Sequence, residues 1–192
     1  MSLPVDKKPV ENQRYTFTDY YSWDDGKRWE LIDGIPYEMH VMSPAPSRTH
    51  QWIVGQLHLQ LASFFKGKPG EVYIAPFDVR LNSDNADDIV VQPDIVVVCD
   101  SSMLNEKGCK GAPDMVIEVL SQSTARHDRL VKFRLYQNAG VREYWIVDPD
   151  SRTVSAHVLE NGKYIVTPYG DEGSAPVHVL EGFEIKLPEV FG

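Results

Sequence analysis

Three acidic residues open or interrupt apolar segments of the sequence. Glu118 lies inside the run MVIEVL, Asp94 opens DIVVVC directly after a proline, and Glu30 lies in WELI. A carboxylate within an apolar strand is costly unless it is paired, hydrogen-bonded or bound to a metal. Each acid also has a structural interpretation: an ion pair or sheet-edge position for Glu118, a turn or cap for Asp94, and an exposed strand position for Glu30.

The three acids together indicate a metal site, provided that their segments are neighbours in one sheet. Mg²⁺ takes oxygen ligands and keeps several waters, so two carboxylates and a backbone carbonyl are enough ligands from the protein. Such a metal polarises a phosphoryl oxygen and lowers the pKa of a bound water. Lys132 is the candidate cation that would stabilise the developing negative charge. Its helical face also holds Asp128 and Tyr136, and the alternative for Lys132 is a surface ion pair with Asp128.

Helices and strands that could position these residues follow from the hydrophobic periodicity. The pattern predicts a short helix within 16–23, a hairpin of 28–33 and 35–42 with Asp33-Gly34 near its bend, and a helix from Ser47 to about Phe65. Strand-like segments follow at 71–81, 94–99, 114–120 and 143–147, a helix capped by Ser123 or Thr124 runs to Ala139, and antiparallel hairpins fill 153–187. The core face of the 47–65 helix is predicted to be Ile53, Leu57, Leu61 and Phe64.

This order of elements predicts an α/β or α+β fold, in which one mixed β-sheet core is flanked by helices and followed by C-terminal antiparallel hairpins. The strand after the 124–139 helix is expected to lie near the 114–120 strand through a βαβ crossover. We expect residues 1–14 to form a flexible arm and residues 15–192 to form a single domain.

Composition and charge narrow the class of protein. The chain has 192 residues, 42% of them hydrophobic, and no apolar run approaches the roughly 20 residues that span a bilayer. With two cysteines and no signal-peptide pattern, we expect a cytoplasmic protein without a membrane partner. The net charge of −9 argues against a protein coated in basic residues. Residues 120–145 nevertheless hold five basic and two acidic residues, a local +3 against −12 for the remainder, so contact with a phosphate backbone is expected near this segment.

Glu30, Pro93-Asp94 and Glu118-Val-Leu resemble the PD-(D/E)-x-K nuclease superfamily. The stretch VIEVLSQSTARHDRLVKFRLYQNAGVREYWIVDP is more closely similar to the Uma-two family of restriction-endonuclease-like proteins, as are WELIDG, QPDIVVV and the helix that contains His50. The resemblance covers roughly residues 15–190. It implies a restriction-endonuclease-like sheet core and Mg²⁺-dependent hydrolysis of phosphodiesters, with Mn²⁺ as a possible substitute.

Site residues are carried over from this resemblance by position. Asp94, Glu118 and the backbone carbonyl of Val119 would be metal ligands, and Glu30 would contact the metal directly or through a bound water. The superfamily's lysine falls at position 120, which is Leu here; in the Uma-two family it has moved to the next helix, which points to Lys132. Weaker candidates for substrate binding are His50, Gln122 and Arg126.

Three functions stay open on the sequence alone. The first is a metal-dependent DNA endonuclease, which by analogy with its fold is expected to act as a homodimer. The second is a nucleic-acid-binding or interaction module that keeps the nuclease fold without its chemistry, which Leu120 and the negative net charge favour. The third is a structural protein that dimerises through the C-terminal hairpins.

Overall fold

A six-stranded mixed sheet forms the centre of the molecule, with the strand order β12-β11-β10-β9-β6-β3. The computed structural model describes residues 8–10, 13–39, 47–82, 85–121 and 128–192. In chain order, the central strands are β3 (Glu71–Ile74), β6 (Ile95–Val98), β9 (Met115–Val119), β10 (Glu143–Asp148), β11 (Thr153–Glu160) and β12 (Lys163–Tyr169). Strands β9 and β10 are parallel, and the other neighbouring pairs are antiparallel. The predicted mixed-sheet core is confirmed.

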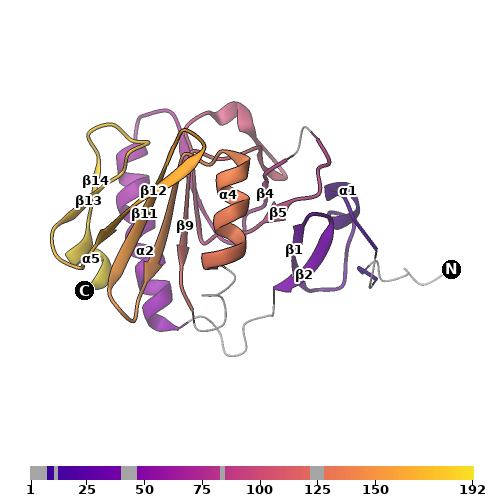
Figure 1. Ribbon diagram of the computed structural model, residues 1–192, viewed down its shortest axis with the longest axis horizontal. Coiled ribbons are helices and arrows are strands. Elements are labelled where there is room, and N and C mark those ends of the chain that lie inside the picture. The colour runs from indigo at the N-terminus through magenta and orange to yellow at the C-terminus, as the bar shows by residue number, and fades with distance from the viewer. Residues whose placement is uncertain (1–7, 11–12, 40–46, 83–84, 122–127) are drawn as a thin grey trace.

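The parallel pair is joined by the predicted βαβ crossover, which runs through a π-helical turn η2 (Asp128–Lys132) and the helix α4 (Phe133–Ala139). Gly140 ends α4 in the left-handed conformation, with φ of 87°, as the sequence predicts. The predicted capping residues Ser123 and Thr124 lie outside the described residues. Helix α4 covers one face of the central sheet, as Figure 1 shows.

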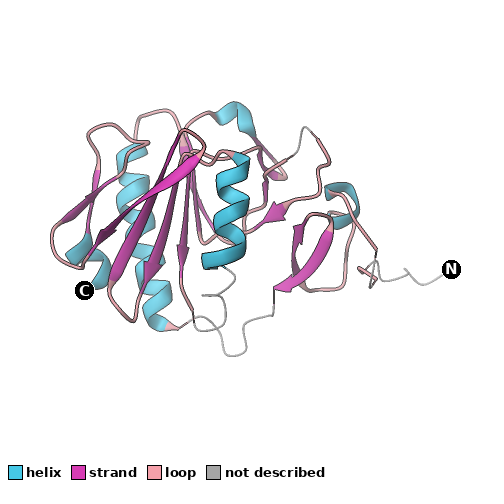
Figure 2. Cartoon of the chain, viewed as in Figure 1, coloured by secondary structure: helices cyan, strands magenta, loops and turns pink. Residues whose placement is uncertain are grey.

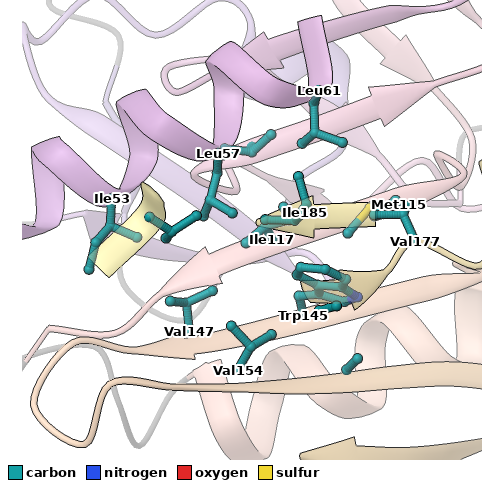
Figure 3. Packing of buried hydrophobic residues seen from close by; sticks show 14 of the residues in the cluster. Ile53, Leu57, Leu61, Met115, Ile117, Trp145, Val147, Val154, Val177 and Ile185 are labelled. Atoms are coloured by element: carbon teal, nitrogen blue, oxygen red, sulfur yellow. The ribbon is translucent and has the colours of Figure 1, made fainter. Parts of the chain in front are cut away.

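Helix α2 (Arg48–Phe65) covers the opposite face of the central sheet. Its side chains Ile53, Leu57 and Leu61 are buried against Ile117 and Trp145 (Figure 3). Phe65 belongs to the buried cluster, whereas the predicted Phe64 is only partly buried against it. The other residues closing this core come from the two-stranded sheet of β13 (Ser174–Pro176) and β14 (Glu184–Lys186) and from α5 (Leu187–Phe191), a helix that the sequence analysis missed.

A second six-stranded sheet lies beside the first, which corrects the expectation of a single sheet. Its order is β2-β1-β5-β4-β8-β7, and it comprises β1 (Arg28–Ile32), β2 (Ile35–Met39), β4 (Val79–Arg80), β5 (Val90–Val91), β7 (Leu104–Asn105) and β8 (Gly108–Lys110). The predicted strand over 71–81 is therefore two strands, β3 and β4, that belong to different sheets. Several of these strands have only two residues, too few to produce a recognisable alternation of apolar side chains.

Two of the places where the chain passes between the sheets are neighbouring bends, residues 75–78 and residues 92–94. The backbone N–H of Ala75 in the first bend donates to the carbonyl of Asp94 in the second, at 3.1 Å. Asp94, one of the three acids singled out in the sequence, therefore lies where the chain enters the central sheet. The seam between the sheets is the natural place for side chains of both sheets to meet.

Figure 2 shows the remaining elements, among which α1 and the first hairpin were predicted from the sequence. The helix α1 (Phe17–Tyr20) begins after Thr16, whose backbone N–H and hydroxyl both donate to Asp19. Asp33 and Gly34, with φ of 50° and 74°, turn the β1–β2 hairpin, and β2 is an edge strand as Pro36 predicts. A short 3₁₀ turn, η1 (Ser101–Met103), precedes β7. Among the described residues, no helix combines the length and apolar character that crossing a bilayer requires.

Candidate active site

The ammonium group of Lys132 lies between two buried carboxylates. Its Nζ is 3.0 Å from Oε1 of Glu30 and 2.9 Å from Oε1 of Glu118. The exposed fractions of the three side chains are 3% for Lys132, 0% for Glu30 and 5% for Glu118. Glu30 comes from β1 of the second sheet, Glu118 from β9 of the central sheet and Lys132 from η2. This cluster therefore joins three elements across the seam.

The alternation along β9 explains why Glu118 points at Lys132. Ile117 and Val119 belong to the core beneath α2, whereas Val116 and Leu120 belong to the core beneath α4. Successive strand residues face opposite sides, so Glu118 faces the α4 side. This arrangement excludes a surface ion pair for Lys132, because the lysine side chain is buried against Glu118. It also bears out the structural alternative for Glu118, an ion pair with a residue of the following helix.

Tyr136, one helical turn after Lys132, is a second donor to Glu118. Its hydroxyl donates to Oε1 of Glu118 at 2.9 Å. Burial raises the pKa of Tyr136 well above its usual value, and the neighbouring charges of Glu118 and Glu30 raise it further. The phenol therefore stays protonated and acts as a hydrogen-bond donor. The sequence carried a signal for this role, since Tyr136 lies four residues after Lys132 on the same helical face.

Asp94 lies across from Glu118 on the neighbouring strand. The register pairs Ile95 with Ile117, so continuing it by one residue places Asp94 opposite Glu118. Directly opposite residues of an antiparallel pair share one face of the sheet. Oδ2 of Asp94 accepts a hydrogen bond of 2.8 Å from the backbone N–H of Val119 and lies 3.3 Å from Nε2 of His50. His50, in the first turn of α2, is thus brought to the same site.

Gln92 is a site residue that the sequence analysis missed. Its backbone N–H donates to Oε1 of Glu30 at 2.9 Å, and its side-chain oxygen accepts two hydrogen bonds, of 3.0 and 2.7 Å, from Arg28. Its side-chain amide donates to Tyr20 and Asp78. The only sequence signal was its place two residues before Asp94. The contacts of Gln92 with Arg28 and Glu30 depend on the second sheet, which the sequence did not reveal.

The charge of this site suits a hard divalent cation. Glu30, Asp94 and Glu118 bring three carboxylates, against which stand Lys132 and, when protonated, His50. All ligand atoms on the three acids are oxygens, which Mg²⁺ prefers, and two of these acids lie opposite each other. Within the described part of the chain, no three acidic, histidine or cysteine side chains converge tightly enough to hold a metal by themselves. The oxygen donors of the acids would suit an ion such as Mg²⁺, which takes oxygen ligands and usually keeps several waters.

The remaining candidates for a functional role either lie outside the described residues or do not belong to this site. Gln122 and Arg126 belong to 122–127 and lie outside the described residues. Burial, assisted by the charge of Asp114, raises the pKa of the Cys109 thiol to about 12 and that of Cys99 to about 11. Both thiols are thus protonated near neutral pH, which disfavours a nucleophilic or metal-binding role for either cysteine.

Comparisons with known proteins show the family and the fold of this chain. The profile of the Uma2 family, described as "Putative restriction endonuclease", matches residues 17–188. An uncharacterized protein of Synechocystis is 28% identical over 155 residues, which cover 79% of this chain and 78% of that protein. The crystal structure of a "putative nuclease belonging to DUF820" from Anabaena variabilis superimposes with a TM-score of 0.72 at 19% identity, over 92% of this chain and 97% of that one. The last likeness establishes a shared fold.

Proposed function

The chain belongs to the Uma2 family of restriction-endonuclease-type proteins, and we propose that it is a divalent-metal-dependent endonuclease that hydrolyses phosphodiester bonds of DNA. The observation that carries this proposal is the buried contact of Lys132 with Glu30 and Glu118, with Asp94 across the sheet from Glu118. Burying a lysine between acids of two sheets has a large desolvation cost. A site that must stabilise the negative charge of a phosphate would explain why the lysine is there.

Asp94 and Glu118 would hold the ion, assisted by the carbonyl of Val119, and Glu30 would contact it directly or through a water. Mg²⁺ is the expected ion, with Mn²⁺ as a substitute. A bound ion of this kind polarises a phosphoryl oxygen and lowers the pKa of a coordinated water. These assignments use oxygen donors only, in keeping with the preference of Mg²⁺.

The chain's own residues prepare the site for a negatively charged substrate. The ammonium of Lys132 would orient a water and stabilise the charge that develops on the phosphate. Tyr136 holds Glu118 by a hydrogen bond, and the N–H of Gln92 holds Glu30. The N–H of Val119 and the imidazole of His50 fix Asp94. Each carboxylate is thus oriented before the substrate arrives, which lowers the cost of assembling the site.

DNA would reach this site past the basic segment that includes Arg134; Arg142, in the same segment, is paired with Asp114 at the other end of β9. The local balance of +3 over residues 120–145 favours a phosphate backbone there, in an otherwise acidic protein. His50, Gln122 and Arg126 are the further candidates for substrate contact. Since duplex DNA has two strands to cut, a homodimer is the expected assembly, by analogy with the fold.

Cleavage of supercoiled and linear DNA with Mg²⁺ or Mn²⁺ tests this function. Asp94→Asn should abolish cleavage while the protein keeps its fold, because the amide keeps an oxygen that can accept from Val119. Asp150→Asn is the matched control, since Asp150 is exposed in the turn after β10. Unchanged cleavage by Asp94→Asn would refute the proposed role of the acids.

The second candidate is a module that binds nucleic acid without cleaving it. Leu120 favours it, since this buried residue stands where the superfamily has its lysine. This candidate predicts salt-sensitive binding of DNA and no turnover with either ion. Metal-dependent turnover that Asp94→Asn removes would exclude it.

A further inference from the structure

A cleft of about 490 Å³ lies next to the candidate active site. Gln92 belongs to both places: its backbone N–H bonds to Glu30 in the site, and its side chain lines the cleft. The other lining residues that the argument uses are Tyr21, Tyr73, Phe77, Asp78 and Lys107, and Glu106 adds a second carboxylate to the lining. This volume falls in the range of roughly 300–1,000 Å³ that is typical of small-ligand sites.

Asp78 lines this cleft, and two hydrogen bonds hold its carboxylate. Oδ1 accepts two hydrogen bonds, one of 2.9 Å from the hydroxyl of Tyr20 and one of 2.8 Å from the side-chain amide of Gln92. Both bonds use the same oxygen, and no hydrogen bond among the described residues uses Oδ2. The orientation of the carboxylate is therefore set by the protein, while Oδ2 is available to accept from a ligand.

Gln92 fixes Asp78 without being available to a ligand itself. Its amide group donates to Tyr20 and Asp78, and its oxygen accepts from the guanidinium of Arg28. All of its strong hydrogen-bonding positions are thus occupied within the protein. Gln92 therefore supports the cleft and leaves recognition to Asp78.

Gly108 brings the adjoining turn, with Lys107, against the backbone of Asp78. Its φ is +111°, and a Cβ at this position would lie 2.1 Å from the carbonyl oxygen of Asp78. Glycine is thus required for this close approach. The Nζ of Lys107 lies 4.3 Å from the ring centroid of the half-exposed Tyr21, which places an ammonium group at the cleft.

The cleft wall is aromatic. The rings of Tyr73 and Phe77 are parallel, with centroids 4.1 Å apart and planes inclined by 6°, and both residues are partly exposed. Flat aromatic surfaces of this kind stack on nucleobases, a contact worth about 1–3 kcal/mol per base. A fixed carboxylate, an aromatic wall and an ammonium group match the three parts of a nucleotide: base edge, base face and phosphate.

We propose that this cleft binds one unpaired guanine of the nucleic-acid substrate, with Asp78 accepting from the base edge and the base stacked on the aromatic wall. This inference rests on the proposed function, whose substrate class it narrows to single-stranded or locally opened strands. Lys107 would contact the adjacent phosphate. Because Gln92 links the cleft to Glu30, the bound guanine would lie close to the phosphate that is cut.

Guanine is favoured by the hydrogen bonds that its edge offers. It presents two adjacent donors, N1–H and the 2-amino group, and Oδ2 of Asp78 can accept from both, while Oδ1 stays bonded to Tyr20 and Gln92. Adenine and cytosine each present one amino donor beside a ring nitrogen acceptor, and thymine presents one N–H between two carbonyls. An acceptor facing a carboxylate is repelled, so the other bases gain less.

The test is fluorescence anisotropy with labelled nine-nucleotide thymidine strands whose central position is guanine, adenine, cytosine or thymine, in EDTA to prevent cleavage. Wild type should bind the guanine strand roughly 5- to 100-fold more tightly than the others, on the order of what one specific contact to a base edge provides. Asp78→Asn should remove this preference; its amide keeps an oxygen for Tyr20 and Gln92 but can present a donor to the base. Phe77→Leu should weaken the binding of all four strands, and Phe183→Leu, in the core beneath α2, is the matched control.

Equal binding of the four strands by wild type, or an unchanged preference in Asp78→Asn, would overturn the guanine cleft. Phe77→Leu serves as the second variant if Asp78→Asn fails to fold, and unchanged binding by it would also count against the cleft. Metal-dependent cleavage without base preference would refute the cleft and leave the proposed nuclease function standing. Guanine preference without any cleavage would support the cleft and count against the nuclease function.

Discussion

The ammonium of Lys132 lies 3.0 Å from Oε1 of Glu30, and both side chains are almost completely withdrawn from solvent. Glu30 belongs to the second sheet, and Lys132 belongs to the crossover that covers the central sheet. Their contact therefore fastens the two sheets together at the point where Asp94 and Glu118 face each other. The same interaction would serve both the stability of the fold and the chemistry of the site.

Lys132→Met should lower the free energy of unfolding by about 3–5 kcal/mol, because it leaves two buried carboxylates without their cation. The double variant Lys132→Met with Glu118→Gln should recover part of this loss. Urea denaturation measures both. Lys186→Met is the control, since Lys186 is 67% exposed in its ion pair with Glu189. A loss no larger than that of the control would mean that Lys132 does not occupy the buried position.

Tyr136→Phe should lower the free energy of unfolding by about 1.5–3 kcal/mol, the range for a hydrogen bond to a charged group. The matched variant is Tyr164→Phe, because the hydroxyl of Tyr164 donates to the neutral carbonyl of Val141 at 2.9 Å. That bond should contribute about 0.5–1.5 kcal/mol. Denaturant unfolding of both variants should rank Tyr136→Phe as the more damaging, and the reverse order would argue that Glu118 is uncharged or differently placed.

Leu57→Ala should destabilise the protein by about 2–5 kcal/mol, since Leu57 is fully buried between α2 and the central sheet. Leu59→Ala, two residues along the same helix, should have little effect because Leu59 is 58% exposed. Thermal or urea denaturation compares the pair directly. Equal effects of the two substitutions would contradict the assigned face of α2.

His157 predicts a pH dependence of stability. Burial lowers its pKa below the usual 6.5, although hydrogen bonding to the carbonyls of Tyr144 and Ser155 opposes the shift. The unfolded chain therefore takes up a proton at a higher pH than the folded protein does. The contribution of His157 to stability is complete above pH 6.5 and is lost as the pH falls toward the pKa that His157 has in the folded protein.

His157→Gln isolates this contribution. The urea midpoint of wild type should fall between about pH 7.5 and pH 5.5, and the variant should lose part of that fall, because glutamine does not titrate there. The comparison is between the two slopes, so other titrating groups cancel. Parallel slopes would show that His157 is not responsible.

Much of the site was predictable because its residues break a local rule. Glu118 was conspicuous as a carboxylate in a buried strand, and the βαβ order placed a helix with Lys132 over it. Asp94 was found by its place at the start of another apolar strand, although proximity to Glu118 depends on antiparallel pairing that the sequence left open. Local patterns thus pointed to the acids, the family resemblance pointed to Lys132, and the sheet register determined which of them meet.

The second sheet and Gln92 could not be predicted in the same way. Strands β4 and β5 have two residues each, so neither shows a period, and their pairing joins segments distant in the sequence. Gln92 is an ordinary polar residue in its segment, and its contacts arise only where the two sheets meet. The buried cluster contains Phe65, whereas the sequence predicted Phe64. With 3.6 residues per turn, the next core residue can follow Leu61 by three or by four positions, so the pattern does not separate the two.

Calorimetric titration of Mn²⁺ into wild type, Asp94→Asn and the exposed control Asp150→Asn tests the central claim most directly, because it requires no knowledge of the substrate. We predict that wild type and Asp150→Asn bind Mn²⁺ and that Asp94→Asn loses this binding while its circular dichroism spectrum stays unchanged. Absence of binding by wild type, or equal binding by all three proteins, would contradict the metal site and with it the proposed nuclease mechanism.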